Sequence, residues 1–367
     1  MNNTKPKILY LFKTGRGFIY KNKDYSNDFL YGYDFLKKKG YSIDFFDILD
    51  LKIKYSLFSK LKTKILAYYF NLNSNYQELS FISEKINKYD ILVCTTNSIA
   101  FAASYLKYKK IIFPKIIFIN QGILSRIYKL KIKSLKYYLL KKYFDRNFSS
   151  ISLIIHLGKP EHIYFNSIFA KYEFKSFYIP FAVDDIFWKY KEYKLNERKY
   201  FLFIGNDLNR NFLLLERIVK NNPNINFLFV TNKKFKSYNN LKQIHGHLTK
   251  KLLTDKDILN YYHEAIATLI PIKNTLQPSG QSVMLQSLSV GTPVIISKFD
   301  GFFDSKLKNL ENCIITDNSN FNETLNDYLS LDLSLINCIS YNGRKTIEEN
   351  FNLDKVYTEF ENKILSM

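Results

Sequence analysis

The sequence contains little cysteine, little arginine and no long hydrophobic run. Its three cysteines, Cys94, Cys313 and Cys338, are scattered and form no CxxC pair. This spacing argues against a structural zinc site and is typical of proteins kept in a reducing cytosol. No stretch reaches about 18 consecutive apolar residues, so we expect no membrane-spanning helix. The apolar run at 8–12 is followed at once by Lys13, so we expect no signal peptide.

The chain is strongly basic, but its positive charge comes almost wholly from lysine. It has 54 basic and 33 acidic residues, a net charge of +21, and only seven of the basic residues are arginine. Proteins that bind nucleic acid rely on arginine for paired contacts to bases and phosphates. We therefore expect no nucleic-acid partner. Two interpretations of the charge stay open: a solvated lysine-rich surface, and attraction to anionic lipid.

Short apolar runs alternate with helical patterns along a chain of 367 residues, which is long enough for two domains. Alternating strands and helices predict an α/β fold with parallel sheets covered on both faces. Helices are expected through Phe29, Tyr33 and Leu36 up to Gly40, and from 353 to 365. The expected strands are 7–12, 42–46, 91–94, 116–119, 153–156, 200–204, 227–230, one near Ile244, 267–270 and 294–296.

The stretch 276–296 combines a glycine-containing loop, an apolar helix and a buried strand. The loop holds Ser279, Gly280, Gln281 and Ser282, and the helix is expected over 283–290. A glycine loop that leads into a helix exposes unpaired N–H groups at the positive end of the helix dipole, where phosphate binds. The stretch therefore indicates either a phosphate site or an ordinary loop–helix–strand unit.

Two loops near the start of the chain follow predicted strands. Gly15, Arg16 and Gly17 follow the first strand, and Gln121 follows the strand at 116–119. Ligands of parallel sheets bind beyond the carboxyl ends of the strands, so both loops are candidates for a site. The first loop lacks the third glycine of a dinucleotide fingerprint, which argues against a nicotinamide cofactor.

Four segments of the second half resemble, in order and spacing, the donor-binding domain of GT-B glycosyltransferases, especially the retaining enzymes of family 4. They are IPFAVD at 179–184 with Phe187, FLFIGNDLNR at 201–210, IHGHL at 244–248 followed by AIATLIPI at 265–272, and the stretch 276–296. The resemblance implies two Rossmann-like domains that face each other across a cleft. These would be an acceptor-side domain at 1–185, a donor domain at 186–345, and a C-terminal helix at 346–367 that crosses back.

The resemblance also implies a function. A sugar would pass from a nucleotide-diphosphate donor to a cell-surface glycan or a lipid-linked saccharide, with retention of configuration. The partners would be a nucleotide sugar, a glycan or lipid-linked acceptor and an anionic membrane surface. The protein would be cytoplasmic and peripheral on the inner face of the membrane. No metal and no other cofactor is expected.

The resemblance assigns residues to both sides of the cleft. Arg210 would lie on the donor diphosphate and act in catalysis together with Gln281, and Gln286 would accept a hydrogen bond from ribose. The departing phosphate itself would take the acceptor's proton. The donor-binding residues would be Gly205, Asn206, Arg210, Gly246, Ser279, Gly280, Gln281, Ser282 and Gln286. The acceptor-side residues would be Gly15, Arg16, Gly17 and Gln121.

The sequence departs from the family where the family carries acidic residues. No carboxylate lies between Glu264 and Asp300. Gln286 and Pro278 stand where the family has glutamate, and Gln121 stands where relatives often carry histidine. The alternative interpretation is therefore a GT-B-shaped protein that binds a glycan or a nucleotide sugar without transferase activity.

Two basic amphipathic stretches, 54–70 and 126–146, complete the sequence evidence. The second carries eight basic residues against one acid, Asp145, interleaved with isoleucine, leucine, tyrosine and phenylalanine. Either stretch is compatible with an anionic membrane face and with an ordinary surface helix that packs on the protein's own core.

Overall fold

The computed structural model describes residues 5–13, 15–51, 74–246 and 253–367. The described residues form two compact α/β units. Unit 1 comprises Met1–Lys21, Phe29–Pro180 and Tyr357–Met367, and unit 2 comprises Asn22–Asp28 and Phe181–Val356. The predicted boundaries were 185/186 and 345/346. The contacts also assign the short segment Asn22–Asp28 to unit 2.

Unit 1 is built on a six-stranded parallel sheet with the strand order β2-β1-β3-β4-β5-β6. Helix α2 packs on β2, α6 on β3 and β4, and α9 on β5 and β6. The strands are β1 Ile8–Phe12, β2 Ile43–Asp47, β3 Ile91–Cys94, β4 Lys115–Asn120, β5 Leu153–His156 and β6 Ser176–Tyr178. The helices are α1 Arg16–Tyr20, η1 Asp28–Leu30, α2 Tyr33–Lys38, η2 Ile48–Asp50, α4 Tyr76–Phe81, α5 Ser83–Ile86, α6 Asn97–Tyr108, α7 Ser125–Tyr128, α8 Leu135–Ser149, α9 Lys159–Ile168 and η3 Ala170–Lys175.

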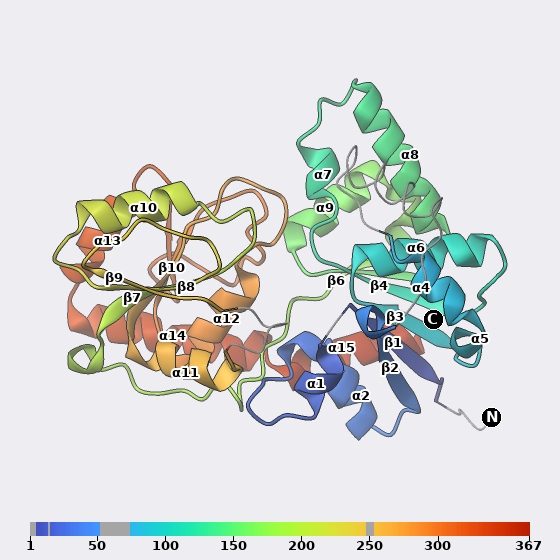
Figure 1. The fold of residues 1–367 in the computed structure, drawn as a ribbon, viewed down its shortest axis with the longest axis horizontal. Coiled ribbons are helices and arrows are strands. Elements are labelled where there is room, and N and C mark those ends of the chain that lie inside the picture. Colours follow the sequence, from blue (N-terminus) through green and yellow to red (C-terminus); the bar gives the residue numbers. More distant parts are fainter. Residues whose placement is uncertain (1–4, 14, 52–73, 247–252) are drawn as a thin grey trace. The chain divides into compact units, whose positions relative to one another are not determined.

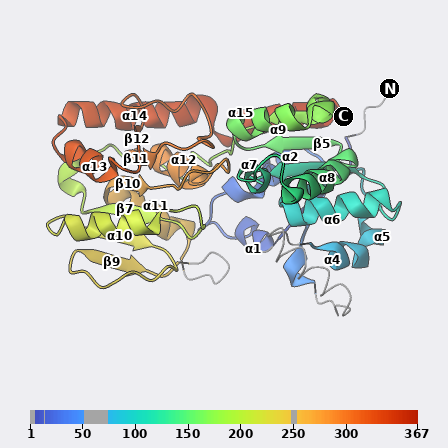
Figure 2. The same cartoon turned by 90° about the horizontal axis from the view of Figure 1, so that it is seen from above.

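Unit 2 repeats this plan with the strand order β12-β11-β10-β7-β8-β9, again all parallel. Its strands are β7 Tyr200–Ile204, β8 Phe227–Val230, β9 Leu241–Ile244, β10 Ala265–Ile270, β11 Val294–Ser297 and β12 Ile314–Thr316. Its helices are η4 Leu195–Glu197, α10 Phe212–Asn221, α11 Asp255–Glu264, α12 Gln281–Val290, α13 Phe321–Leu329 and α14 Leu333–Asn350, and the last helix is α15 Leu353–Leu365 (Figure 2).

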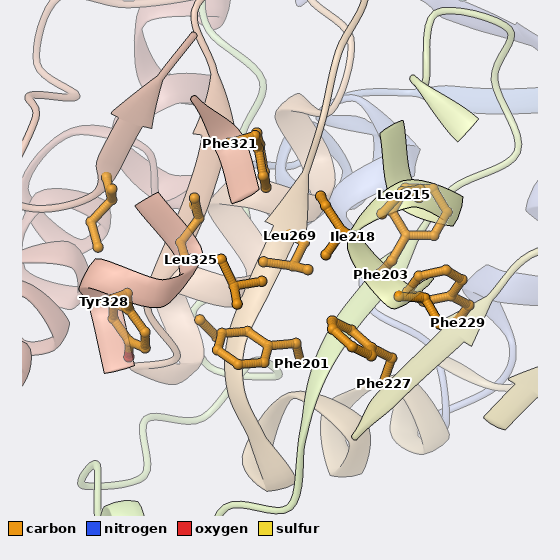
Figure 3. Close-up of a cluster of buried hydrophobic side chains, with 14 of the residues drawn as sticks. Phe201, Phe203, Leu215, Ile218, Phe227, Phe229, Leu269, Phe321, Leu325 and Tyr328 are labelled. Carbon is orange, nitrogen blue, oxygen red and sulfur yellow. The ribbon is translucent and has the colours of Figure 1, made fainter. Parts of the chain in front are cut away.

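The core of unit 2 explains why these strands are apolar on both sides. Phe201 and Phe203 of β7 and Phe227 of β8 pack against Leu215 of α10 and Leu325 of α13 (Figure 3). Helices α11 and α12 contact strands of the same sheet. A parallel sheet covered on both faces buries every side chain of its central strands. The continuous apolar runs in the sequence therefore become strands, and the α/β prediction is confirmed.

One predicted helix is wrong in detail. The pattern through Phe29, Tyr33 and Leu36 predicted a single helix, whereas the structure has the short helix η1 followed by α2. Tyr31 and Gly32 between them adopt positive φ angles of 49° and 85°, which no α-helix contains. The apolar spacing was right because Tyr33 and Leu36 are both buried on α2.

Candidate donor site

The strand order of unit 2 places one loop pair at a switch point of the sheet. β7 is followed by β8 and β9 on one side, and the chain then returns to β10 on the other side of β7. Open parallel sheets bind ligands beyond the carboxyl ends of the strands at such a point. The loops that leave β7 at Ile204 and β10 at Ile270 are those that hold Gly205 to Arg210 and Ser279 to Gly280.

Backbone and side-chain hydrogen bonds hold these two loops together. Asn211 N donates to Pro271 O at 2.9 Å, and Lys273 N donates to Asn209 O at 2.8 Å. The side-chain Nδ2 of Asn209 donates to Ser279 Oγ at 2.8 Å. The loop before α12 therefore has one fixed position relative to the loop that carries Arg210.

Arg210 is buried in unit 2, and its guanidinium lies against Gly205 and Gly280. Its side chain is 4% exposed. A Cβ on Gly205 would lie 2.6 Å from Arg210 Nε, and one on Gly280 would lie 2.7 Å from Nη1. Because a side chain at either position would collide with the guanidinium, both glycines make room for it. The guanidinium of Arg210 therefore lies directly beside the Gly280 turn.

The guanidinium of Arg210 is incompletely satisfied. Nε lies 2.8 Å from Oδ2 of Asp207, but its N–H does not point at that oxygen, and Nη1 has no hydrogen-bond partner among the described residues. Burial lowers the pKa of Arg210, and Asp207 opposes this effect. A buried charged donor without an acceptor is costly. An anion at Nη1 would remove that cost.

The start of α12 supplies further donors beside Arg210. Gly280 precedes the helix with a φ of 82°, and no side chain of the described residues caps it. The first amides of a helix have no partner within the helix, and they carry the positive end of its dipole. Gln281, which is buried, and Ser282, which is half-buried, are its first two residues. Arg210 and this helix start together form a site suited to a diphosphate.

Gln286 lies one turn further into α12, and its amide group is bonded inside unit 2. Nε2 donates to Oδ2 of Asp28 at 2.7 Å, and Oε1 accepts from the hydroxyl of Tyr262 at 3.4 Å. To meet a ribose, Gln286 would have to exchange one of these partners. Its assignment to ribose stays a prediction.

Asp28 is the buried carboxyl group that the glutamine meets. Its Oδ1 accepts from Asp184 N at 2.6 Å, and its Oδ2 accepts from Trp188 Nε1 at 2.8 Å in addition to Gln286. Burial raises the pKa of Asp28 to about 7 against the opposing effect of the donors. Asp184, from the IPFAVD segment, in turn accepts from the backbone and side chain of Asn27. The segment Asn22–Asp28 is thereby bonded into unit 2.

Asn206 and Gly246 close the far side of the switch-point edge. Asn206 Nδ2 donates to Gly246 O at 3.2 Å, and its Oδ1 accepts from Asn232 N at 2.6 Å and from Thr231 Oγ1 at 3.1 Å. These bonds join the ends of β7, β8 and β9.

The first glycine loop of unit 1 already holds a carboxylate. Arg16 N donates to Oδ1 of Asp47 at 3.1 Å and Gly17 N donates to Oδ2 at 2.8 Å. Gly15 has a φ of 72°, with open space at the position that a Cβ would take. The Arg16 guanidinium lies 4.8 Å from the ring centre of Phe29. Because Asp47 accepts from both amides, they do not offer a vacant anion site.

Gln121 is exposed after β4, and hydrogen bonds to buried side chains hold the loop around it. Its Nε2 donates to Tyr31 Oη at 2.9 Å and to Thr95 O at 2.6 Å. Asn120 Oδ1 accepts from Gly122 N and Ile123 N, and Glu161 Oε1 accepts from Leu124 N at 2.9 Å. Burial raises the pKa of Glu161 to about 7. The side chains of β4 and α9 thus position the Gln121 loop.

A buried histidine lies beside this loop. His156, the last residue of β5, has Nδ1 at 2.9 Å from Asn120 Nδ2, and its Nε2 has no partner among the described residues. Burial lowers the pKa of His156 well below its usual value, so the imidazole is neutral. Its ring packs on Phe165. These contacts are those of a histidine that packs in the core and orients Asn120.

A cavity of about 270 Å³ in unit 1 lies away from either candidate edge. It is lined by residues at the amino ends of β4, β5 and β6, including Lys115, Leu153 and Lys175. Lys175 Nζ donates to the carbonyl oxygens of Phe148 and Ile151. The lysine therefore serves the end of α8, and the cavity is not part of the donor site.

Several residues that shape the site carried no signal in the sequence. Asp28 and Gln286 are 258 positions apart, and Asp47 is 30 positions from Gly17. Asn209 lies within the segment similar to the family, but its role is visible only from its bond to Ser279. Asp184 was the exception, because the IPFAVD segment drew attention to it.

The described residues contain no group of three His, Cys, Asp or Glu side chains placed to hold a metal ion. Within that same part of the chain, no helix is long and apolar enough to cross a membrane. The whole basic stretch 54–70 lies outside the described residues, so the prediction made for it stays untested.

Solved glycosyltransferase structures have the same architecture over nearly the whole chain. A glycosyltransferase from Rickettsia africae is 13% identical, with a TM-score of 0.67 over 98% of this chain and 99% of that one. HepE from Anabaena in complex with UDP-glucose is 12% identical, with a TM-score of 0.66 over 99% and 100%. Sucrose-phosphate synthase from Thermosynechococcus elongatus is 11% identical, with a TM-score of 0.69 over 97% and 98%.

No protein-family model matches the sequence, and no curated protein matches it. At identities of 11–13%, the likeness indicates a shared fold but not a shared substrate. The two parallel six-stranded sheets, the strand order of each and the full-length likeness agree with one another. The chain therefore has the GT-B fold, built from two Rossmann-like units, that its sequence predicts.

Proposed function

We propose that this protein is a glycosyltransferase that moves a sugar from a nucleotide-diphosphate donor to a cell-surface glycan or a lipid-linked saccharide, with retention of configuration. One observation carries the proposal. The buried guanidinium of Arg210 has Nη1 without a partner among the described residues, directly beside Gly280 at the start of α12. This combination is matched to a diphosphate because it supplies a fixed cation and the amides of a helix start at one point.

The solved neighbours support the choice of donor class. One of the HepE structures contains UDP-glucose and another contains UDP with glucose. A donor of this type would place its diphosphate at Arg210 and the amides of Gln281 and Ser282. UDP-sugars are therefore the first donors to test, ahead of those carrying GDP or CDP.

The reaction would depend on stabilising the leaving group. The bond between the anomeric carbon and the phosphate oxygen breaks, and a bond from that carbon to the acceptor oxygen forms on the same face. The acceptor's proton passes to the departing phosphate. Arg210 and the helix start would stabilise the charge that develops on the diphosphate. No carboxylate of the loop takes part, because the sequence has none between Glu264 and Asp300.

The acceptor would meet unit 1 at the Gln121 loop. Gln121 is exposed, and its Nε2 is already bonded to Tyr31 and Thr95. Its remaining amide oxygen is suited to accept a hydrogen bond from a sugar hydroxyl. A lipid-linked acceptor would bring the protein to the cytoplasmic face of a membrane.

A second candidate is a protein that binds a nucleotide sugar without transferring it. The observation in its favour is that Gln286 and Pro278 replace acidic residues, and that the Gln286 amide is bonded to Asp28 and Tyr262. Such a protein would keep the diphosphate site and lose the contacts that orient the sugar.

Ligand-induced stabilisation followed by turnover separates the candidates. The thermal transition is measured with UDP, GDP, CDP and their sugars, and release of nucleoside diphosphate is then followed with and without candidate acceptors. Stabilisation with release supports the transferase, and stabilisation without release supports the binding protein. The absence of any nucleotide response would exclude both. An Arg210→Ala variant should lose the stabilisation and lower turnover by orders of magnitude while keeping its fold.

A further inference from the structure

Large apolar side chains and lysines alternate over the turn between α7 and α8. Figure 1 shows this segment projecting beyond the strands of unit 1. Ile132 is 75% exposed and Leu135 is 73% exposed. We call this surface the α7–α8 tip. It consists of the exposed residues Tyr128, Lys129, Lys131, Ile132, Lys133, Leu135, Lys136, Tyr138 and Leu139.

Helix α8 satisfies the protein's own core with a different stripe. Tyr137, Leu140, Phe144 and Phe148 are buried, and Phe144 packs on Phe101 of α6. The sequence left open whether the apolar residues of this stretch serve the core or an outside surface. In the structure the buried stripe packs into the core, and the tip presents a second set of apolar side chains that the core does not use.

The lysines of the tip lack acidic partners among the described residues. None of Lys129, Lys131, Lys133 and Lys136 forms an ion pair within the part of the chain that the structure describes. The one acid of the stretch, Asp145, pairs with Lys171. An exposed apolar patch costs solubility unless it has a partner. The surrounding charge selects a partner that is negative and apolar together.

We propose that the α7–α8 tip docks on the surface of an anionic lipid bilayer. Ile132, Leu135 and Leu139 would enter the boundary between headgroups and acyl chains, where tyrosine rings such as that of Tyr138 are also favoured. The lysines would keep their ammonium groups at the headgroups while their stems lie along the apolar residues. The inference rests on the proposed function for its lipid-linked acceptor, whereas docking itself requires no turnover.

Vesicle sedimentation with the full-length protein tests the proposal. Binding to phosphatidylcholine vesicles with and without phosphatidylglycerol is measured at low salt and at about 0.5 M NaCl, where charges on the surface are screened. Each basic residue near an anionic surface contributes about fivefold in affinity. Four such contributions multiply to about 600-fold, so replacing all four tip lysines by glutamine should weaken binding to anionic vesicles by about two to three orders of magnitude. Ile132→Ser with Leu135→Ser should weaken binding at both salt concentrations.

A control variant separates the tip from overall charge. Lys88, Lys109, Lys220 and Lys234 are exposed and form no ion pair among the described residues, so their replacement by glutamine removes the same charge elsewhere. This variant should bind vesicles within about twofold of the parent if the tip provides the contact. All the substituted side chains are exposed, so the thermal transitions should match that of the parent.

Four results would overturn the proposal: equal binding to neutral and anionic vesicles, equal losses in the tip and control variants, tip-dependent oligonucleotide binding without vesicle binding, or a tip-dependent dimer in place of vesicle binding. Nucleotide stabilisation and turnover with a soluble acceptor report on the proposed function independently. A tip variant that keeps turnover but loses vesicles supports docking. A parent protein that binds vesicles but ignores every nucleotide would refute only the transferase.

Discussion

Replacing Arg210 by methionine should separate the roles of this residue in folding and in binding. In the ligand-free protein the guanidinium is buried and its Nη1 is unsatisfied, which costs about 1–3 kcal/mol. The ion pair with Asp207 involves a carboxylate that is 37% exposed. Water can replace that partner, so its loss costs under about 1 kcal/mol. Methionine fills similar space at a cost below about 1.5 kcal/mol. The terms nearly cancel, and the free energy of unfolding should change by less than about 1.5 kcal/mol.

Ligand affinity should respond much more strongly than stability. A hydrogen bond from a charged donor to phosphate contributes about 1.5–3 kcal/mol, so Arg210→Met should raise the Kd for UDP by about 10–150-fold. Turnover should fall further, because charge on the departing diphosphate grows in the transition state. Urea unfolding without ligand, calorimetric titration with UDP and release of UDP from a UDP-sugar measure the three effects.

Arg198 is a matched control in the same unit. It is also buried, and its Nη2 has no partner among the described residues, but its Nη1 donates to the carbonyl oxygens of Tyr262 and His263 at 3.1 Å and 2.6 Å. Arg198→Met should therefore destabilise the protein by about 2–4 kcal/mol and leave the Kd for UDP unchanged. If Arg210→Met destabilises the protein as much as this control and UDP affinity is unaltered, Arg210 is structural and the diphosphate site is wrongly placed.

Three further substitutions follow from particular contacts. Gly280→Ala should lower the free energy of unfolding by about 1–2 kcal/mol because of the positive φ, and it should weaken UDP binding because the added Cβ would lie 2.7 Å from Nη1 of Arg210. Gly40→Ala is the control, since Gly40 has the same φ of 82° with open space around it. Calorimetry should show an unchanged UDP affinity for the Gly40 variant. The pKa of Asp28 is raised to about 7, so the folded state holds this proton more tightly than the unfolded state, and the resulting stability is full below about pH 4 and is lost as the pH rises through 7. Asp28→Asn should flatten that part of the urea-unfolding profile, by on the order of 4 kcal/mol, and an unchanged slope would contradict the assignment. Asp47→Ala should remove the acceptor of two amides and lower stability by about 1–3 kcal/mol, with the KM for the acceptor rising while donor affinity stays constant in steady-state kinetics.

The fold was predictable where burial dictates sequence. β3, β5, β7 and β8 match the predicted strands because a central parallel strand must be apolar on both faces. The capping box that Thr254 forms with Asp257 at the start of α11 is a local feature of the same kind, since it depends on residues three positions apart. β6 and β12 were missed, because strands of three residues at a sheet edge leave too short a pattern.

The site was predictable only as far as local sequence defines it. The glycine before α12 and the arginine after β7 were identifiable from their own loops, and their approach follows from the pairing of β7 with β10. The partner of Gln286 was not, because Asp28 reaches it from a segment at the other end of the chain. Asp47 was missed for a similar reason, since the pairing of β1 with β2 brings it to the first glycine loop.

The network around Gln286 bears on how the missing acidic residues affect the chemistry. A glutamate at 286 would lie at hydrogen-bond distance from the carboxyl group of Asp28, and two buried carboxylates in contact repel each other and resist ionisation. Glutamine avoids that conflict, because its Nε2 donates to Asp28 and its Oε1 accepts from Tyr262. Without a carboxylate in the loop before α12, Arg210 has one nearby competitor for the diphosphate, the partly exposed Asp207. The arrangement favours a strong hold on the departing diphosphate over a precise hold on the sugar, and the choice of sugar should therefore depend on residues outside this loop.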